Sequence, residues 1–517
     1  MALVRDIIIV GGGTAGWIAA AYLAKRLNSA SPDGVRVTVI EAPDIPPIGV
    51  GEGSFPSLRK TLEAIDIDEA ELIRECSATF KQGIRFNDWL IAPSATARHH
   101  YFHPFQLSDD HDGLDLLPYW LLGAAGEVAW ASANTVQQVA ADACLAPKLA
   151  QHPPYRGPLA YAYHFDAALL GRLLRRRALE LGVTHVVDTV TSVQLADDGA
   201  IAELACRDSG THRAGLYVDC TGFRAQLIGQ ALDVPFRSRR AELFTNRAVA
   251  IQLPYRSTQS PVPSQTFATA QHAGWIWDIG LHERRGTGYV YSTDHCSDDD
   301  AERTLRDYLG PDAERSNARR LDFETGYRTA QWHKNCVAIG LSAGFIEPLE
   351  ATGIGFAEIA VMNLVNIFPW NGQMEVSARQ FNEIMVRRYD HVVDFIKLHY
   401  CLSRRDDDPF WRDNRDSSTI SDSLRERLER WRYRAPAFMD VDLNHDVFLA
   451  ENWQYVLYGM HFRTDLTAQA GSYRFFEDAR RTFADIRAQQ ANAVRRLPPH
   501  RALIQQLGAT MPAVALT

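Results

Sequence analysis

Three glycines near the N-terminus have the spacing of a site that binds the pyrophosphate of a dinucleotide. Gly11, Gly13 and Gly16 form a Gly-x-Gly-x-x-Gly pattern directly after an apolar run at residues 6–10. The first glycine permits a tight turn, the second lets the backbone approach a pyrophosphate, and the third allows a helix to pack closely on a strand. The free backbone amides of a helix that begins at this turn favour the binding of a negatively charged phosphate. Glu41 follows the next apolar run and can accept hydrogen bonds from ribose hydroxyls.

The surrounding segments supply the structural context that this pattern requires. Residues 6–10 predict a strand buried on both faces, residues 17–27 a helix, and residues 35–40 a second strand. A strand, a helix, a second strand and an acid in this order predict dinucleotide binding.

Two later turns favour FAD over NAD as the dinucleotide. They are residues 219–222 and 340–344, each after an apolar strand, and the second leads into an apolar helix predicted at 354–367. The N-terminal amides of that helix could face a flavin ring. The sequence contains neither a second glycine fingerprint nor a readable site for NAD(P)H as hydride donor, so we expect a tightly held flavin that is reduced elsewhere.

Composition narrows the class of protein. The chain has 517 residues, 46 % hydrophobic and 23 % charged, a balance that excludes wholesale disorder. A net charge of −9 argues against a general nucleic-acid-binding or membrane-coating protein. Seven scattered cysteines without a CxxC pair argue against a disulfide framework and a structural zinc site. Without a signal-peptide profile or a long charge-free apolar stretch, we expect a cytoplasmic protein that binds neither metal nor membrane.

The rest of the chain predicts an interleaved organisation. We expect a helix at 165–181, a strand at 183–193, and antiparallel sheet from about 241 to 293. Helices are predicted at 379–404, 421–432 and 474–496, where mixed charges have helical spacing. Residues 1–375 are therefore predicted to hold the dinucleotide-binding core, interleaved with a substrate-side sheet at roughly 85–165 and 240–330, and residues 376–517 to form a mainly helical part that covers the substrate.

Several segments together resemble the flavin-dependent halogenases of the tryptophan halogenase family. They are residues 11–17 (GGGTAGW), 49–52 (GVGE), 80–83 (FKQG), 275–279 (WIWDI), 345–354 (FIEPLEATGI) and 394–400 (DFIKLHY). The likeness covers residues 1 to about 415 in order, and the double tryptophan and PLEATGI are its most specific signals. It implies an α/β fold, namely a Rossmann-like FAD-binding fold of the GR2-type flavin monooxygenase kind with a mixed substrate-side sheet and a helical C-terminal part.

The resemblance also implies an electrophilic aromatic substitution that uses FADH2, O2 and chloride or bromide. In the family, reduced FAD and O2 form a C4a-hydroperoxide, which a halide attacks to give hypohalous acid. Lys81 matches the family's lysine, whose ammonium can hydrogen-bond the hypohalous oxygen or form a transient haloamine. Glu350 matches the family's glutamate, which can orient the oxidant and accept the proton that leaves the ring. Outside this context, Lys81 would be a solvated surface charge and Glu350 a first-turn acid that stabilises the following helix.

Further roles follow from the same resemblance. The amides of Thr352 and Gly353 would form the halide pocket, since backbone N–H groups suit a small anion. Trp275 and Trp277, which point to one face of a strand, would lie near the flavin and keep the organic substrate away from it; an aromatic core pair is the alternative. The other residues expected to contact FAD are Thr14, Ala15, Gly49, Val50, Gly51, Gly340, Leu341 and Ile354.

The organic substrate is the least defined part of the sequence-based interpretation. His103, Phe105 and Trp453 resemble an aromatic sandwich that stacks an indole ring. A structural histidine beside Pro104 and a core tryptophan are the alternatives. Because no clamp for the amino-acid part of tryptophan is readable, free indole, tryptophan and other electron-rich aromatics all stay open.

Two other functions fit parts of the sequence. A single-component aromatic hydroxylase would take electrons directly from NAD(P)H, and a redox-neutral flavoprotein such as a cyclase would need neither halide nor O2. The leading hypothesis, an FADH2-dependent halogenase, implies a separate NAD(P)H-dependent flavin reductase and a small aromatic substrate, with no nucleic-acid partner, and it leaves a homodimer open.

Overall fold

The computed structural model describes residues 3–44, 51–107, 113–442 and 446–509. The chain forms two compact units, and each is assembled from three separate segments. Unit 1 comprises Met1–Ala78, Phe165–Arg239 and Phe323–Asp390; unit 2 comprises Thr79–His164, Arg240–Asp322 and His391–Thr517. Among the described residues, no helix combines the length and the apolar character that a membrane span requires.

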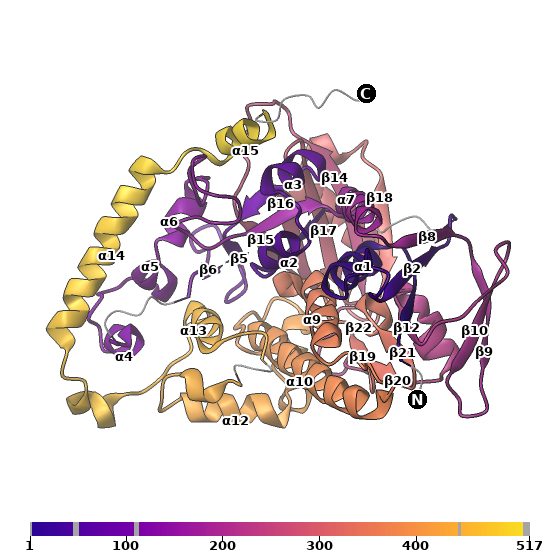
Figure 1. Ribbon diagram of the computed structural model, residues 1–517. Coiled ribbons are helices and arrows are strands. Elements are labelled where there is room, and N and C mark those ends of the chain that lie inside the picture. Colours follow the sequence, from indigo (N-terminus) through magenta and orange to yellow (C-terminus); the bar gives the residue numbers. More distant parts are fainter. Residues whose placement is uncertain (1–2, 45–50, 108–112, 443–445, 510–517) are drawn as a thin grey trace. The chain divides into compact units, whose positions relative to one another are not determined.

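Unit 1 is built on a six-stranded sheet whose central strands are parallel. Its strand order is β20 (Trp332–His333), β21 (Cys336–Ala338), β12 (Leu216–Asp219), β1 (Asp6–Val10), β2 (Arg36–Glu41) and β8 (Thr184–Val187). Only the β20–β21 pair is antiparallel. β1, the helix α1 (Thr14–Arg26) and β2 confirm the predicted strand–helix–strand unit (Figure 1).

Several helices of unit 1 pack against α1. α1 contacts α7 (Ala167–Glu180) and α9 (Thr352–Asn366). The alanines of α1 at 19–21 are fully buried, and their small side chains let neighbouring helices approach closely. α2 (Leu58–Ala64) and α3 (Glu69–Glu75) complete this layer, and β3 spans Gly51–Gly53.

The prediction of one continuous strand at 183–193 is wrong. It divides into β8 and β9 (Val190–Leu195), which belong to different sheets. The division occurs at Asp188, whose carboxylate accepts hydrogen bonds from the amides of Thr189 and Ser209. A bond from a side chain to an adjacent amide, such as that of Thr189, stabilises a turn in place of a continuous strand. β9 pairs with β10 (Ile201–Cys206), which pairs with β11 (Thr211–His212). A second small sheet of unit 1 contains β13 (Phe236–Ser238), β19 (Gly326–Arg328) and β22 (Gly344–Phe345).

Unit 2 contains the predicted mixed sheet, with seven strands. Their order is β18 (Ala318–Asp322), β14 (Arg247–Pro254), β17 (Arg284–Tyr291), β16 (Gly274–Gly280), β15 (Thr266–Gln271), β5 (Gly83–Asn87) and β6 (His100–Pro104). All neighbouring strands are antiparallel except β15 and β5. Outside this sheet, the short strand β4 (Thr79–Lys81) pairs antiparallel with β7 (Ala162–Asp166).

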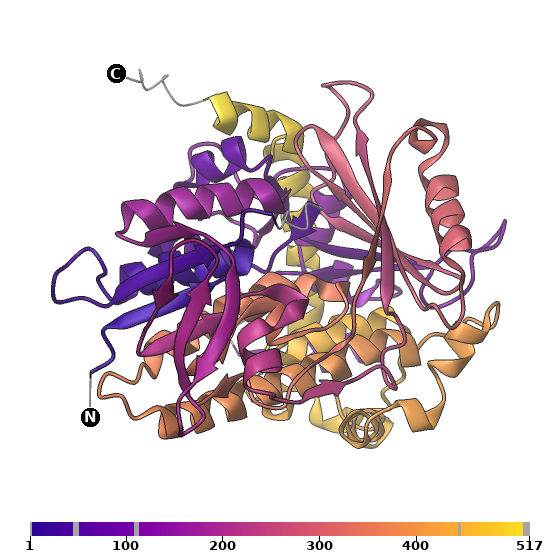
Figure 2. The same cartoon turned by 90° about the vertical axis from the view of Figure 1, so that its right-hand side faces the viewer.

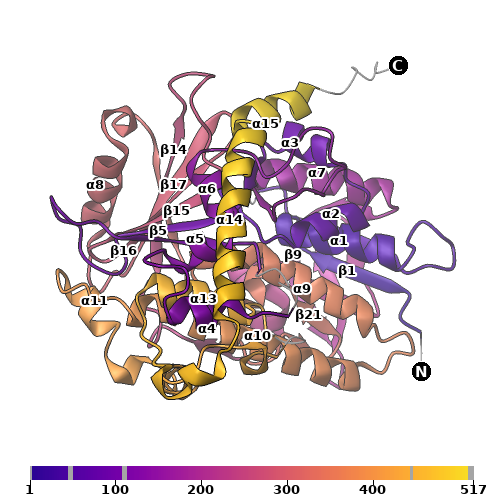
Figure 3. The same cartoon turned by 90° about the vertical axis from the view of Figure 1, so that its left-hand side faces the viewer.

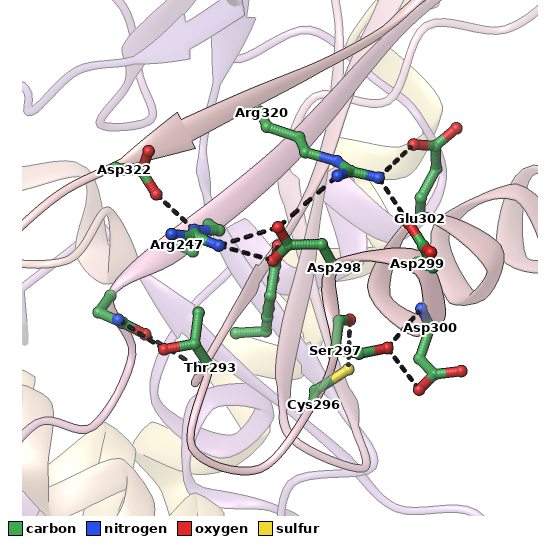
Figure 4. A network of polar contacts seen from close by, with 12 residues as sticks. Arg247, Thr293, Cys296, Ser297, Asp298, Asp299, Asp300, Glu302, Arg320 and Asp322 are labelled. Atoms are coloured by element: carbon green, nitrogen blue, oxygen red, sulfur yellow. Dashed lines mark hydrogen bonds and ion pairs between the residues drawn. The ribbon is translucent and has the colours of Figure 1, made fainter.

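Helix α8 (Asp298–Leu309) lies against β14 and β17 of this sheet (Figure 2). A network of ion pairs fastens it there (Figure 4). Arg247 on β14 binds Asp298 at 2.8 Å and also contacts Asp322, and Arg320 on β18 binds Asp299 at 2.9 Å. Several linked charges hold a geometry better than one exposed pair, so the network fixes the outer half of the sheet.

The C-terminal part is mainly helical, as predicted. α10 (Met374–Cys401) begins in unit 1 and ends in unit 2. It is followed in unit 2 by α11 (Pro409–Asp413), α12 (Asp422–Trp431), α13 (Ala450–Gly459), α14 (Phe476–Arg496) and α15 (His500–Ala509). Unit 2 also contains the short helices α4 (Leu116–Leu121), α5 (Trp130–Asn134) and α6 (Gln137–Asp142). α14 contacts α4, α5 and α6 along its length (Figure 3).

Candidate active site

The turn between β1 and α1 has the shape of a pyrophosphate cradle. Gly11 has a φ of +114°, and a Cβ there would lie 2.2 Å from the carbonyl oxygen of Cys220. At Gly16, a Cβ would lie 2.0 Å from the carbonyl oxygen of Gly11. Both positions therefore require glycine. Among the described residues no atom lies within 4 Å of a Cβ placed at Gly13, and this N-cap glycine has no side chain to cap the first amides of α1, so backbone donors at this turn can serve an anion.

Glu41 lies at the end of β2, beside this turn. A Cβ at Gly12 would lie 2.2 Å from Glu41 Oε1, so the carboxylate reaches across the glycines. Its other oxygen lies 2.9 Å from His185 Nε2. This position fits an acceptor for ribose hydroxyls next to a bound pyrophosphate.

Two further turns follow β12, which neighbours β1, and β21, the next parallel strand beyond β12. After β12, the buried Asp219 carboxylate accepts hydrogen bonds from the amides of Thr221 and Leu227, at 2.9 and 2.8 Å. After β21, Gly340 has a φ of +77° and a Cβ there would lie 2.7 Å from the Cβ of Ala15. The three turns meet at the carboxyl ends of neighbouring strands, where α/β sheets bind ligands.

The remaining residues predicted to contact the dinucleotide lie in unit 1. Thr14 starts α1 and donates a hydrogen bond to the carbonyl of Ala167 at 3.3 Å. Leu341 lies in the turn after β21 and Ile354 in the first turn of α9. Gly51 begins β3, whereas Gly49 and Val50 lie outside the described residues.

Helix α9 begins with an unusual backbone. Glu350 and Ala351 both have left-handed conformations, with φ of 67° and 57°, and non-glycine residues in this region cost about 1–3 kcal/mol each. Glu350 precedes the first residue of α9, so it is not the first-turn acid of the alternative interpretation. Its side chain is only 3 % exposed. Backbone strain of this kind is concentrated at functional sites.

The first two residues of α9, Thr352 and Gly353, are those predicted to bind the halide. Thr352 is buried, and its Oγ1 has no hydrogen-bond partner among the described residues. Gly353 is exposed, with no atom within 4 Å of the position a Cβ would take. The N-cap residue, Ala351, has no polar side chain that could cap the helix. The amides at a helix start, the helix dipole and a hydroxyl without a partner among the described residues favour a small anion here.

Lys81 is the last residue of β4, and its side chain is fully buried, with 0 % exposed. The interpretation as a solvated surface charge is therefore wrong. Within unit 2, the Nζ atom lies 5.1 Å from the centroid of the Phe105 ring. A buried ammonium is costly unless polar or charged groups compensate it, so this lysine is not an ordinary surface residue.

Trp275 and Trp277 lie on one face of β16, as their spacing predicts. Their ring centroids are 6.5 Å apart. Trp275 is buried beside Trp89, at 6.4 Å. Trp277 lies over Gly288 of β17, where a Cβ would lie 2.0 Å from its ring. Their role beside a flavin stays a prediction.

Two of the predicted substrate residues, His103 and Trp453, belong to an aromatic cluster of unit 2. His103 on β6 and Trp453 on α13 are both buried, and each contacts Phe395, at 5.8 and 5.0 Å between ring centroids. Asn452 Nδ2 lies 3.0 Å from His103 Nε2. Phe105, just after β6, is half-buried.

Sequence reasoning left several members of this cluster without a role, among them Phe395 and Asn452. Phe395 lies in the DFIKLHY segment and Asn452 stands next to Trp453, so both carried a signal without an assigned role. Contact with an aromatic substrate stays a prediction for His103, Phe105 and Trp453.

Comparison with known proteins decides the family. The model of the tryptophan halogenase family matches residues 6–472. The chain belongs to the tryptophan halogenase family. It is 39 % identical over 453 residues to tryptophan 6-halogenase SttH of Streptomyces toxytricini, which covers 83 % of this chain and 84 % of that protein.

Solved structures of this family confirm the predicted fold. The crystal structure of a tryptophan halogenase from Shewanella frigidimarina matches with a TM-score of 0.94 and 42 % identity over 98 % of both chains. Tar14, a tryptophan C-6 flavin-dependent halogenase from taromycin biosynthesis, matches with a TM-score of 0.91 and 34 % identity over 98 % of this chain and 100 % of its own. This family member is therefore an enzyme, a flavin-dependent halogenase with a Rossmann-like FAD-binding fold.

Membership of the family also defines the class of cofactors and partners. Tryptophan halogenases use FAD, a halide and O2. They depend on a separate flavin reductase and act on a small aromatic substrate.

Proposed function

We propose that this enzyme forms hypohalous acid from FADH2, O2 and chloride or bromide, and uses Lys81 and Glu350 to halogenate an indole- or tryptophan-like substrate. A separate NAD(P)H-dependent reductase would supply the FADH2. The names of its relatives, which include tryptophan 6-halogenases, support this substrate class. The catalytic assignment rests on the match of Lys81 and Glu350 to the family's lysine and glutamate, and the observation that supports it is the complete burial of the Lys81 side chain beside an aromatic ring.

The glycine turn and Glu41 would hold the dinucleotide. Reduced FAD, when bound, supplies the electrons with which O2 and halide give the oxidised halogen. The amides at the start of α1 would bind the pyrophosphate beside Gly13, and Glu41 would accept hydrogen bonds from the ribose. The open space at Gly13 and the lack of space at Gly11 and Gly16 support this arrangement.

Substitution of two of these glycines separates cofactor binding from folding. Gly13→Ala has room for its methyl group in the protein alone, so we expect an unchanged melting temperature and FAD affinity weaker by on the order of tenfold. Gly16→Ala should lower the melting temperature, because its Cβ overlaps the Gly11 carbonyl. Thermal unfolding without FAD and titration of flavin fluorescence measure both effects. Undiminished affinity in Gly13→Ala would contradict a pyrophosphate at this position.

The start of α9 would bind the halide. The amides of Thr352 and Gly353 would donate to it at a helix start whose N-cap residue, Ala351, offers no side-chain cap, and the Thr352 hydroxyl can donate one further hydrogen bond. An anion that accepts these bonds would satisfy a buried group that otherwise lacks a partner.

A substitution that keeps the shape of Thr352 tests the halide site. Thr352→Val removes only the hydroxyl, whose oxygen has no protein partner among the described residues. We expect an unchanged melting temperature and a KM for bromide raised about tenfold, the usual effect of losing a hydrogen bond to a charged group. Thr352→Ser is the matched control and should keep the KM near that of the wild type. Equal KM values for the valine and serine variants would exclude the hydroxyl from the site.

Lys81 and Glu350 would act on the oxidant and on the ring. The Lys81 ammonium would donate a hydrogen bond to the hypohalous oxygen, or carry the halogen as a haloamine, and so make the halogen more electrophilic. The Glu350 carboxylate would accept the proton released by the ring. Trp275 and Trp277 would separate the flavin from the organic substrate, and His103, Phe105 and Trp453 would stack it.

A product screen tests the proposed function. The enzyme, FAD, NADH and a flavin reductase are incubated with indole, L-tryptophan or phenol in chloride and then in bromide, and products are identified by mass spectrometry. We expect a halogenated aromatic that depends on reductase, halide and O2. Oxidation of NADPH without the reductase would favour the single-component hydroxylase, and a product indifferent to halide and O2 would favour a redox-neutral flavoprotein. Size-exclusion chromatography tests the homodimer.

A further inference from the structure

His500, the first residue of the C-terminal helix α15, reaches the strand that carries Lys81. Its Nε2 accepts a hydrogen bond from the amide of Phe80 at 2.9 Å. Its Nδ1 lies 2.9 Å from the carbonyl oxygen of Val262. A carbonyl only accepts, so Nδ1 carries the proton and Nε2 is free to accept. The imidazole thus bridges two backbone groups of unit 2 as a neutral ring with one defined tautomer.

The bond to Phe80 lies at the open edge of β4. On its other side β4 pairs with β7, with Thr79 opposite His164 and Lys81 opposite Ala162. In an antiparallel pair, alternate residues direct their N–H groups away from the partner strand. His500 therefore takes the place of a second neighbouring strand at the residue directly before Lys81.

The bridge is rigid because its surroundings are closed. His500 is 1 % exposed and Phe80 is fully buried, with their rings 5.9 Å apart. Burial lowers the pKa of His500 to about 4, so the ring stays neutral at neutral pH. Without His500 the buried N–H of Phe80 would lose this hydrogen-bond partner, and a buried N–H without a partner is costly.

The segment that holds His500 is itself docked by its backbone. Residues 498–500 pair with residues 144–146: the amide of Ala146 donates to Pro498, and that of His500 donates to Cys144, both at 2.9 Å. The next residue, Arg501, donates to the carbonyls of Ser260 and His282. Both anchors lie within unit 2, and residues 498–501 lie beyond the part matched by the family model.

We propose that His500 is a positioning residue for Lys81: by bridging the Phe80 amide to the Val262 carbonyl, it fixes the end of β4 and with it the direction of the lysine side chain. The role of His500 rests on the proposed function of Lys81. A catalytic group displaced by about 1 Å can lose much of its effect, so the bridge would matter for turnover and not for binding of substrate.

Three substitutions test this role. His500→Phe keeps a ring of similar size but removes both hydrogen bonds, and we expect kcat to fall about tenfold while the KM values for substrate and halide stay near those of the wild type. In His500→Phe, a larger share of the hypohalous acid than in the wild type should escape and oxidise a soluble thioether added as a trap. His500→Gln keeps an acceptor and a donor and should recover part of kcat. Arg501→Met is the matched control, because it removes the neighbouring anchor without touching β4.

A measurement on the protein without flavin adds an independent readout. Exchange of the Phe80 amide hydrogen should be faster in His500→Phe than in Arg501→Met at equal melting temperature. If Arg501→Met lowers kcat as much as His500→Phe, the effect is one of general stability and the proposal is overturned. If His500→Phe does not fold, a comparison of His500→Gln with the shorter His500→Asn replaces it, and equal kcat values for these two would overturn the proposal.

Lys81→Ala in the same series separates this proposal from the proposed function. If Lys81→Ala halogenates at the wild-type rate, the function proposed for Lys81 is wrong and the role of His500 falls with it. If Lys81→Ala loses halogenation but His500→Phe keeps full turnover, the function proposed for Lys81 stands and only the positioning role of His500 is wrong.

Discussion

Lys81→Ala should lower the rate of halogenation by roughly three orders of magnitude or more, while FAD still binds with its normal affinity. The ammonium is the group proposed to hold and activate the oxidant, and no other side chain at the end of β4 can replace it. Lys81 is not among the residues proposed to contact FAD, so flavin affinity should not change. Product formation is measured by liquid chromatography with a saturating supply of FADH2.

Lys148 offers a matched control for this substitution. It is as buried as Lys81, and its Nζ donates a hydrogen bond to the carbonyl of Pro153 at 2.8 Å. Lys148→Ala should lower the melting temperature, because it leaves an acceptor and a cavity, but the rate per folded molecule should stay near that of the wild type. Near-normal halogenation by Lys81→Ala would remove the lysine from the mechanism.

Glu350→Gln should slow turnover by on the order of a hundredfold, the usual effect of losing a general base. Glutamine has nearly the same size and can keep the left-handed backbone at this position, so the melting temperature should change little. The KM for the aromatic substrate should also stay the same, since the carboxylate is proposed to act on the proton of the cationic ring adduct. Steady-state kinetics with indole measure both constants.

The buried Glu358 on α9 provides a matched acid for comparison. It accepts hydrogen bonds from Thr61 and Ser57 at 2.5 and 3.2 Å, and burial raises its pKa to about 7. Glu358→Gln removes a buried carboxylate from the helix that follows Glu350, without touching the residues proposed to react. Full kcat in Glu350→Gln, or an equal loss in Glu358→Gln, would contradict the assignment of Glu350 as the proton acceptor.

The sequence predicted the parts of the fold that short segments determine. β1, the glycine turn, α1 and β2 follow one another within about forty residues, so their pattern of apolar residues and glycines is enough to define them. The helix predicted at 354–367 begins two residues earlier, at Thr352. The reason is that Glu350 and Ala351 form the left-handed entry to α9, and neither residue type signals such a backbone.

Long-range contacts could not be predicted in the same way. The bond between Phe80 and His500 joins residues 420 positions apart, and the C-terminal helix α15 that carries His500 was not among the predicted helices. The burial of Lys81 likewise depends on packing that no local pattern describes. Its assignment came from the resemblance of the FKQG and PLEATGI segments to the family, and the burial of the side chain adds physical support that the sequence lacked.

The measurement that tests the central claim most directly is the fate of the oxidised halogen. Wild-type enzyme and Lys81→Ala are supplied with limiting FADH2, bromide, O2, indole and an excess of a soluble thioether, and brominated indole and oxidised thioether are both quantified. The account predicts that the wild type transfers most of the oxidised bromine to indole, and that Lys81→Ala consumes the same FADH2 but delivers its oxidant to the thioether. The same partition in both proteins would show that the lysine neither holds nor directs the oxidant, and would contradict the account.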